Sequence, residues 1–129
     1  MKDTAQITDF HAHIYFDTSS REAAARVREG LGASFEVQLG RWHDKSIGPH
    51  PKAMYQVAFL PEQFGKVVPL LMLNREGLDI LVHPETGDDV GDHTDRSLWL
   101  GEKLELNIEF LRASGNNPIT RQLGAISVD

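Results

Sequence analysis

The sequence contains no cysteine, and this absence narrows the kinds of site that it can build. Disulfide bonds cannot form, and zinc sites made of thiolates are excluded. Any transition metal must therefore be held by histidine and carboxylate side chains, which suit zinc, iron, manganese or nickel.

Long apolar runs and an excess of positive charge are also missing. No run approaches the roughly 20 residues of a membrane span, and Met1–Gln6 lacks the apolar core of a signal peptide. We therefore expect a cytoplasmic protein with no membrane partner. The 19 acidic residues outnumber the 13 basic ones, for a net charge of −6. This balance argues against a nucleic-acid partner, because such proteins normally carry a basic patch.

The chain also lacks several catalytic signatures. It has no Gly-rich phosphate loop, no nucleophilic cysteine and no serine-centred elbow. Internal repeats and low-complexity segments are absent as well. Its 129 residues predict a single domain over 1–129, with a core over about 8–110 and a C-terminal tail over 111–129.

Residues 9–16 alternate between apolar and polar side chains. The apolar set is Phe10, Ala12, Ile14 and Phe16, and the polar set is Asp9, His11, His13 and Tyr15. Successive side chains of a strand point to opposite faces, so a strand over 8–16 has one face fit for a core. Its other face carries two imidazoles about 7 Å apart at Cα. A core does not need that second face, and we therefore place the candidate site there.

Periodicity and breaker residues predict the remaining elements. Pro69 falls inside the second predicted helix and should kink or restart it. The elements expected in order are the strand 8–16, a helix with a Ser19–Glu22 capping box ended by Gly30 and Gly32, a strand over 35–42, a loop over 43–51, a strand over 54–60, a helix from Pro61 closed by Gly77, and a strand over 78–83.

This order is βαββαβ, which predicts an α+β, ferredoxin-like antiparallel sheet with its helices on one face. Strands 8–16 and 54–60 are then central, and 78–83 pairs with 8–16. His11, His13, Tyr15 and His83 fall together on the open face. We expect a homodimer partner and the C-terminal segment to cover that face.

Residues 84–129 show no clear pattern. Trp99 and Leu100 are candidates to cover the open face, and the alternation through Leu104, Leu106 and Ile108 suggests a fifth, edge strand. Ser114–Pro118 predicts a turn or the start of a mobile tail.

Histidines occur in marked contexts beyond the first strand. The predicted topology brings His50 towards His13 or Tyr15 and His83 towards the start of the first strand, so that three or four imidazoles can converge on a metal ion. His93 follows Asp92, which suggests either a turn residue or an imidazole oriented by a carboxylate for acid–base work.

For other residues with polar or aromatic side chains, a structural or surface role explains the pattern better than a functional one. We expect His43 to be a solvated loop residue. Glu85, Asp88 and Asp89 fit an acidic turn better than a ligand set, and Arg75 and Arg96 fit surface charge better than a substrate carboxylate site. Trp42 and Trp99 fit a core or interface better than a ring-stacking platform.

Several of these segments in this order and spacing resemble the DOPA 4,5-dioxygenase family. They are Asp9–Phe16, Gly48–Pro51, His83–Asp89 and Asp92-His93, followed by Trp99-Leu100-Gly101. The resemblance covers about residues 8–107. It implies an aromatic ring-opening dioxygenase similar to extradiol enzymes, which cleave a catechol next to its two hydroxyls with Fe(II) and O₂.

The resemblance also implies roles for individual residues. His11, His13 and His83 would be the first-choice metal ligands, followed by His50. The metal would be Fe(II), with zinc or another divalent ion able to replace it in a purified sample. One of His50 and His93 would act as acid–base, and Tyr15 would hydrogen-bond the substrate or the oxygen at the metal. The partners would be a small aromatic diol and O₂.

Two alternatives remain open on the sequence. A dimeric α+β barrel can hold an aromatic substrate without a metal, as cofactor-independent monooxygenases do, with the histidines as acid–base groups. The chain can also be a non-catalytic metal- or ligand-binding module. Metal analysis separates the first alternative from the dioxygenase, and catechol turnover with oxygen uptake removes the second.

Overall fold

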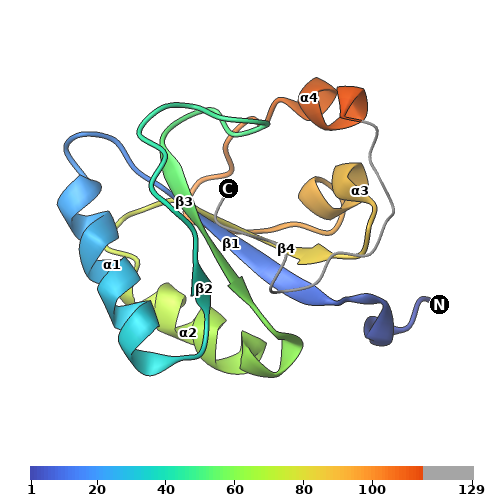
Figure 1. Cartoon of the computed structure of the whole chain (residues 1–129), viewed down its shortest axis with the longest axis horizontal. Coiled ribbons are helices and arrows are strands. Elements are labelled where there is room, and N and C mark those ends of the chain that lie inside the picture. The colour runs from blue at the N-terminus through green and yellow to red at the C-terminus, as the bar shows by residue number, and fades with distance from the viewer. Residues whose placement is uncertain (115–129) are drawn as a thin grey trace.

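The computed structural model describes residues 1–114 of the 129-residue chain. It is an α+β fold with one five-stranded antiparallel sheet and four α-helices (Figure 1). The strands are β1 (Asp9–Tyr15), β2 (Gln38–Leu39), β3 (Met54–Phe59), β4 (Ile80–Glu85) and β5 (Leu98–Leu100). The helices are α1 (Arg21–Ser34), α2 (Phe64–Asn74), α3 (Asp89–His93) and α4 (Ile108–Ala113), with short 3₁₀ turns η1 (Thr4–Gln6) and η2 (Pro61–Gln63). Among the described residues, no helix has the length and apolar character needed to cross a membrane.

The strand order is β2-β3-β1-β4-β5, and the four pairings between neighbours are all antiparallel. The first four strands follow the order expected of a ferredoxin-like sheet, with β1 and β3 central and β4 beside β1. The fifth strand lies beyond β4 and extends the sheet at that edge.

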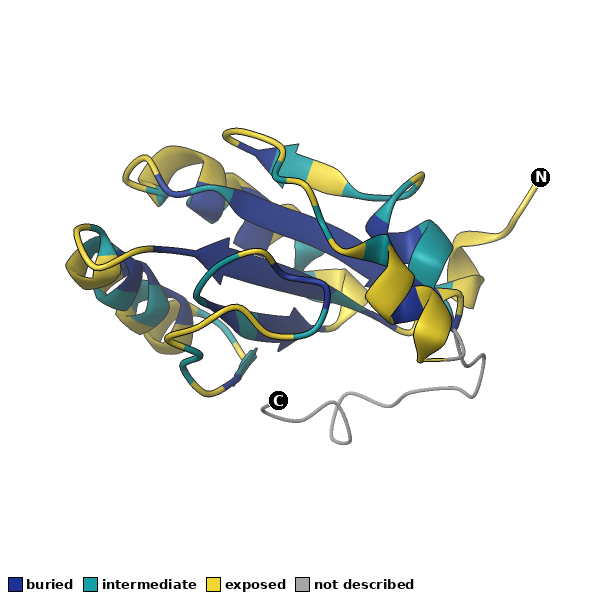
Figure 2. Ribbon diagram, turned by 90° about the horizontal axis from the view of Figure 1, so that it is seen from above, coloured by how far each residue is buried: buried dark blue, intermediate teal, exposed yellow. Residues whose placement is uncertain are grey.

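One face of the sheet forms the main hydrophobic core. Helices α1 and α2 lie together on this face, while α3 and α4 lie on the other (Figure 1). Figure 2 shows central strands that are buried almost throughout, whereas the helices combine buried and exposed residues. The core side chains from the strands include Ala12, Ile14, Val57, Phe59, Ile80 and Val82. The alternation of β1 therefore orients its apolar set as predicted.

Helix α1 is longer than the sequence predicted. It passes through Gly30 and Gly32 and ends at Ser34. Val27 and Leu31 continue the buried stripe of the helix, so their packing offsets the roughly 1 kcal/mol that a glycine costs inside a helix. The predicted Ser19–Glu22 capping box does not form either, because the carboxylate of Asp17 accepts the backbone N–H groups just before the helix.

The strand predicted over 35–42 is reduced to the two residues of β2. Pairing with β3 is irregular here: Gly40 donates its N–H to the Gln56 carbonyl, and His43 forms an isolated bridge with Met54. A Cβ at Gly40 would lie 3.0 Å from the Gln56 carbonyl oxygen, so this close approach favours glycine.

Helix α2 continues through Pro69, whose ring lies on the exposed side, and does not restart there. The helix ends at Asn74 with Arg75 as its C-terminal cap, and the next residue, Glu76, already has a left-handed φ of +51°. Gly77 follows with a φ of +82°, so it belongs to the turn after the helix rather than forming the predicted cap. The strand that follows is shifted from the predicted 78–83 to Ile80–Glu85.

Residues 84–114 are more regular than their pattern suggested. They contain α3, β5 and α4, and the fifth strand is Leu98–Leu100 rather than the predicted segment through Ile108. Leu104 and Leu106 instead pack with Trp99 against buried side chains of the second face, namely Tyr15, Met54 and Leu81. This segment therefore covers part of the open face, as expected, while the homodimer stays a prediction.

The predicted tail begins within the described region. Residues 111–113 belong to α4, and Ser114 is its C-terminal cap. The remainder of the tail, 115–129, lies outside the described residues, as does most of the turn expected at 114–118.

Candidate metal centre

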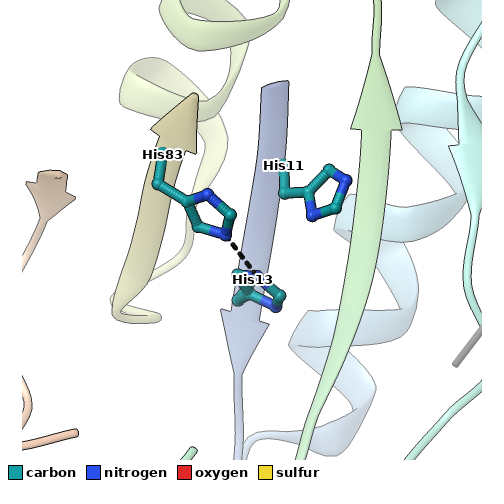
Figure 3. A group of neighbouring side chains, drawn as sticks. All are labelled: His11, His13 and His83. Carbon is teal, nitrogen blue, oxygen red and sulfur yellow. Dashed lines mark hydrogen bonds between the residues drawn. The ribbon is translucent and has the colours of Figure 1, made fainter. Parts of the chain in front are cut away.

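The pairing of β1 with β4 brings three histidines together on the second face of the sheet. His11 lies directly opposite His83, and His13 lies opposite Leu81, so that His13 is the diagonal neighbour of His83. Figure 3 shows the three imidazoles on the same side of these two adjacent strands. The alternation of β1 and the antiparallel register together account for this placement.

These three side chains are buried and close enough to share one ion. One nitrogen from each of His11, His13 and His83 lies within 4.8 Å of the others. The Nε2 atoms of His13 and His83 are only 3.0 Å apart (Figure 3). All three residues are at most 3% exposed. The expected convergence of these three histidines is therefore present in the fold.

Two further histidines join this group. The ring centroids of His50 and His13 are 4.2 Å apart, and the ring centroids of His93 and His83 are 3.9 Å apart. We call these five residues (His11, His13, His50, His83 and His93) the histidine cluster. The sixth, His43, lies outside it and is half-buried, so the expectation of a solvated loop residue is wrong.

Hydrogen bonds to carbonyl groups orient two of the rings. Nδ1 of His83 lies 2.9 Å from the Pro84 carbonyl oxygen, and Nδ1 of His93 lies 2.7 Å from that of Asp89. A carbonyl oxygen only accepts, so each Nδ1 carries a proton. In a neutral ring this leaves Nε2 with a lone pair that can bind a metal or a proton. The lone pair of His83 faces Nε2 of His13, 3.0 Å away.

The partner of His93 differs from the one expected. Asp92 precedes it in sequence, but the Asp92 carboxylate accepts hydrogen bonds from Thr86 and Arg96. His93 is held instead by a backbone carbonyl of its own short helix. The ring is oriented, as predicted, but by a different group.

Tyr15 contacts His50 at the edge of the cluster. Its hydroxyl lies 2.7 Å from Nδ1 of His50, and its ring stacks on Trp99 with centroids 5.9 Å apart. Burial raises the pKa of Tyr15 above its usual value, so the phenol keeps its proton at neutral pH. Trp99 thus packs against the small hydrophobic cluster beside the site, which agrees with the core role expected for it.

Burial favours the neutral form of His13, His50, His83 and His93 by lowering the pKa of each imidazole. It is the main cause that lowers the pKa of His13 and His83 well below the usual 6.5, and the neighbouring imidazoles lower both values further. The pKa of His50 falls to about 3, and that of His93 is also lowered, both mainly by burial. Neutral imidazole is the form that binds a metal ion.

His11 lies between two buried carboxylates. Its Nε2 is 3.4 Å from Oδ2 of Asp9, and its Nδ1 is 3.3 Å from Oε1 of Glu85. The sequence assigned Glu85 to an acidic turn, but this residue ends β4 and is 1% exposed. Extending the alternation of Leu81 and His83 by one step, past Pro84, is the signal that places Glu85 on the same face.

A cavity of about 210 Å³ opens beside the cluster. Its lining includes four of the five cluster histidines; His83 is not among them. The lining residues are His11, His13, His50, His93, Glu85, Asp89, Gln56, Pro49, Phe110, Leu111 and Ser114.

The two arginines that the sequence analysis considered do not line this cavity. Arg75 donates to the Leu78 carbonyl, and Arg96 pairs with Asp88 and Asp92.

The donor set fits a transition-metal ion. Within residues 1–114, Nε2 of His11 and Nδ1 of His13 are buried and have no hydrogen-bond partner, which is costly for a polar atom that remains unbound. Clustered neutral imidazoles suit iron, zinc, copper or nickel. The buried group of His11, His13 and His83 could therefore hold a metal ion, whose identity the geometry leaves open.

Known proteins with similar chains include two fungal relatives and one solved structure. The chain is 40% identical over 115 residues to an uncharacterized 21.2 kDa protein of Botryotinia fuckeliana, covering 80% of this chain and 63% of that protein. It is 35% identical over 116 residues to a DOPA 4,5-dioxygenase of Amanita muscaria, covering 83% of this chain and 51% of that protein. The chain thus spans between half and two thirds of these relatives' length.

A crystal structure from Nostoc punctiforme, described as a "putative dioxygenase", matches with a TM-score of 0.88 and 75% identity. The match covers 88% of this chain and 99% of that one. The model of the Dopa 4,5-dioxygenase family matches residues 10–110, which contain the whole histidine cluster. The resemblance noted in the sequence is therefore confirmed, and the chain belongs to the Dopa 4,5-dioxygenase family.

Proposed function

We propose that this protein opens the ring of a catechol with O₂ at an Fe(II) ion held by the histidine cluster. The observation that carries the proposal is the convergence of five buried imidazoles beside a cavity, in a chain of this family. A core has no use for five histidines on one face, whereas an oxygen-activating iron site does.

The proposed ligands are His11, His13 and His83, with His50 as the next candidate. Their nitrogens already lie together, and burial keeps His13 and His83 in the neutral form that binds a metal. When bound, Fe(II) would supply the redox chemistry that O₂ requires and the positive charge that favours ionisation of a catechol.

One imidazole takes the catechol proton and returns it in this proposal, and the hydrogen bonds favour His93 over His50 for this role. The Nδ1 proton of His93 is engaged with the Asp89 carbonyl, so its Nε2 lone pair can take a proton from the catechol and give the same proton back as the ring opens. Nδ1 of His50 is engaged with the hydroxyl of Tyr15, which orients the ring of His50 beside His13.

The reaction needs no other reductant. Both atoms of O₂ enter the product, and one ring C–C bond breaks beside a hydroxyl-bearing carbon. Pro49, Phe110 and Leu111 contribute apolar side chains to the lining of the cavity, which limits water around the ring.

The test is anaerobic reconstitution with Fe(II), followed by a panel of catechols with oxygen uptake and visible absorbance recorded together. We expect a yellow product and about one O₂ consumed per catechol. The His11→Ala and His83→Ala variants should lose both bound iron and turnover. The His43→Ala variant is the matched control, because it removes an imidazole outside the cluster.

The other outcomes point to the alternatives. Bound iron with no turnover across the panel would leave a metal-binding module or a different oxygenase substrate. Turnover without any bound metal would favour the metal-free mechanism, in which the histidines act only on protons. Full activity of His11→Ala and His83→Ala would refute the ligand assignment.

A further inference from the structure

The charged groups on the cavity wall are all negative in the described part of the chain. Glu85 and Asp89 contribute carboxylates to the lining, and no lysine or arginine of residues 1–114 lines it. Both acidic residues are at most 6% exposed. The charge of the wall is therefore poorly screened by solvent.

Arginines close in sequence to the cavity are engaged with other acids. Arg96 pairs with Asp88 and Asp92 just after α3, and Arg112 pairs with Glu109 on the exposed side of α4. These pairings draw the two guanidinium groups towards acids outside the lining. The acidic character of the cavity thus persists although one arginine follows α3 and another lies on α4.

The cavity is also small. Its volume of about 210 Å³ lies below the roughly 300–1,000 Å³ of sites for drug-sized ligands. It therefore suits one aromatic ring with a short substituent. Within this space, the charged residues that the substituent can meet on the wall are Glu85 and Asp89.

We propose that the cavity selects catechols whose short side chain carries a positive charge over those whose side chain carries a carboxylate. This inference rests on the proposed function, because the buried imidazoles fix where the two hydroxyls bind. The charges of the iron ion and of the catechol oxygens are the same for every substrate, whatever substituent the ring carries. The discrimination therefore comes from the wall, where a second anion is repelled and an ammonium group is attracted.

A matched pair of substrates tests the selection. Dopamine and dihydrocaffeate share the catechol ring and a two-carbon linker, and they differ in the terminal ammonium or carboxylate. Ethylcatechol is the neutral reference. With the iron-loaded protein, we expect kcat/KM for dopamine to exceed that for dihydrocaffeate by about tenfold or more. Equal values, or a preference for dihydrocaffeate, would overturn the proposal.

Variants assign the preference to the two carboxylates. Asp89→Asn and Glu85→Gln should each lower the ratio of dopamine to dihydrocaffeate about threefold or more, after both rates are normalised to ethylcatechol. Asp95→Asn makes the same change of charge at an exposed residue outside the cavity and should leave the ratio as it is. An unchanged ratio in both cavity variants would overturn the assignment.

Binding without oxygen separates this inference from the proposed function. Calorimetric titration of the iron-loaded protein under nitrogen measures the affinity for each compound in the absence of turnover. Tighter binding of dopamine, without ring opening in air, would support the charge selection and refute the dioxygenase. Equal binding of the pair, or binding of neither, would refute the selection.

Discussion

The two faces of the sheet are both buried, yet they are built from opposite kinds of residue. Towards α1 and α2, the central strands present aliphatic and aromatic side chains that pack into one core. Towards α3 and α4, the same strands present three residues of the histidine cluster, His11, His13 and His83, together with Asp9 and Glu85. On β1 the two faces meet at neighbouring residues, His13 and Ile14, which are both almost fully buried.

The difference shows that burial serves two purposes in this fold. Burying an aliphatic side chain contributes roughly 1.5–3 kcal/mol to stability. Burying an imidazole or a carboxylate costs free energy unless the group is paired. The first face therefore provides the stability that allows the second face to hold polar groups in a fixed, partly unpaired arrangement.

The largest effect is expected from removing an imidazole of the second face. His13→Ala should abolish iron binding and lower turnover about thousandfold or more, because a catalytic metal contributes several kcal/mol to the reaction. Iron content and catechol turnover of the purified variant measure this. The unfolding midpoint of the metal-free variant should stay close to that of the metal-free parent. A folded variant that still binds one iron per chain would contradict the expectation.

The neighbouring residue on the first face should behave in the opposite way. Ile14→Ala should lower the free energy of unfolding by about 2–5 kcal/mol, because it leaves a cavity among tightly packed side chains. Denaturant unfolding measures this loss. The fraction that remains folded should bind iron with the stoichiometry of the parent. A variant of normal stability would show that the first face is less important for folding than its packing suggests.

Acid should weaken the metal-free protein through the second face. The lowered pKa values of His13, His50 and His83 mean that the unfolded chain binds protons near pH 6.5 while the folded imidazoles do not. The free energy of unfolding should therefore be fully retained above about pH 6.5 and fall by up to about 1.4 kcal/mol per pH unit and per imidazole below it. Urea unfolding of chelator-treated protein from pH 8 to pH 5 measures this, and a flat profile would contradict it.

The smallest effect is expected from a change at Tyr15, which lies at the edge of the histidine cluster and stacks on Trp99. Tyr15→Phe keeps the stacked ring but removes the hydrogen bond to His50. A hydrogen bond of this kind contributes about 0.5–1.5 kcal/mol. We therefore expect kcat to fall by about tenfold or less, while KM and iron content remain unchanged. Lost iron would instead show that Tyr15 supports the metal ligands.

Much of this two-faced arrangement is already present in the alternation of the sequence. Residues 9–16 predict both faces of β1, and the βαββαβ order predicts that His83 lies near the start of that strand, where it pairs with His11. His50 was expected near Tyr15, and it contacts that hydroxyl. These expectations succeeded because strand periodicity and antiparallel pairing follow from backbone geometry alone.

The rest depended on contacts that no local pattern reports. Helix α3 has five residues and β5 has three, which is too short for a hydrophobic period to emerge. The length of α1 beyond Gly30 is set by packing on the sheet rather than by propensity. Buried Glu85 was missed because an acidic residue after His83-Pro84 is typical of a turn, and only the extended pairing with β1 places it in a strand.

The 3.0 Å approach of His13 to His83 has a consequence for how the chain folds. The two residues are 70 positions apart, and they meet only when β1 and β4 pair in the native register. A slip of one residue would turn the imidazoles of β1 towards the helices and bring aliphatic side chains into the cavity. Pairing across so long a loop is a slow event in folding. A metal ion present during refolding would bind only chains in which β1 and β4 are correctly paired, and it would thereby favour the native register over the slipped one.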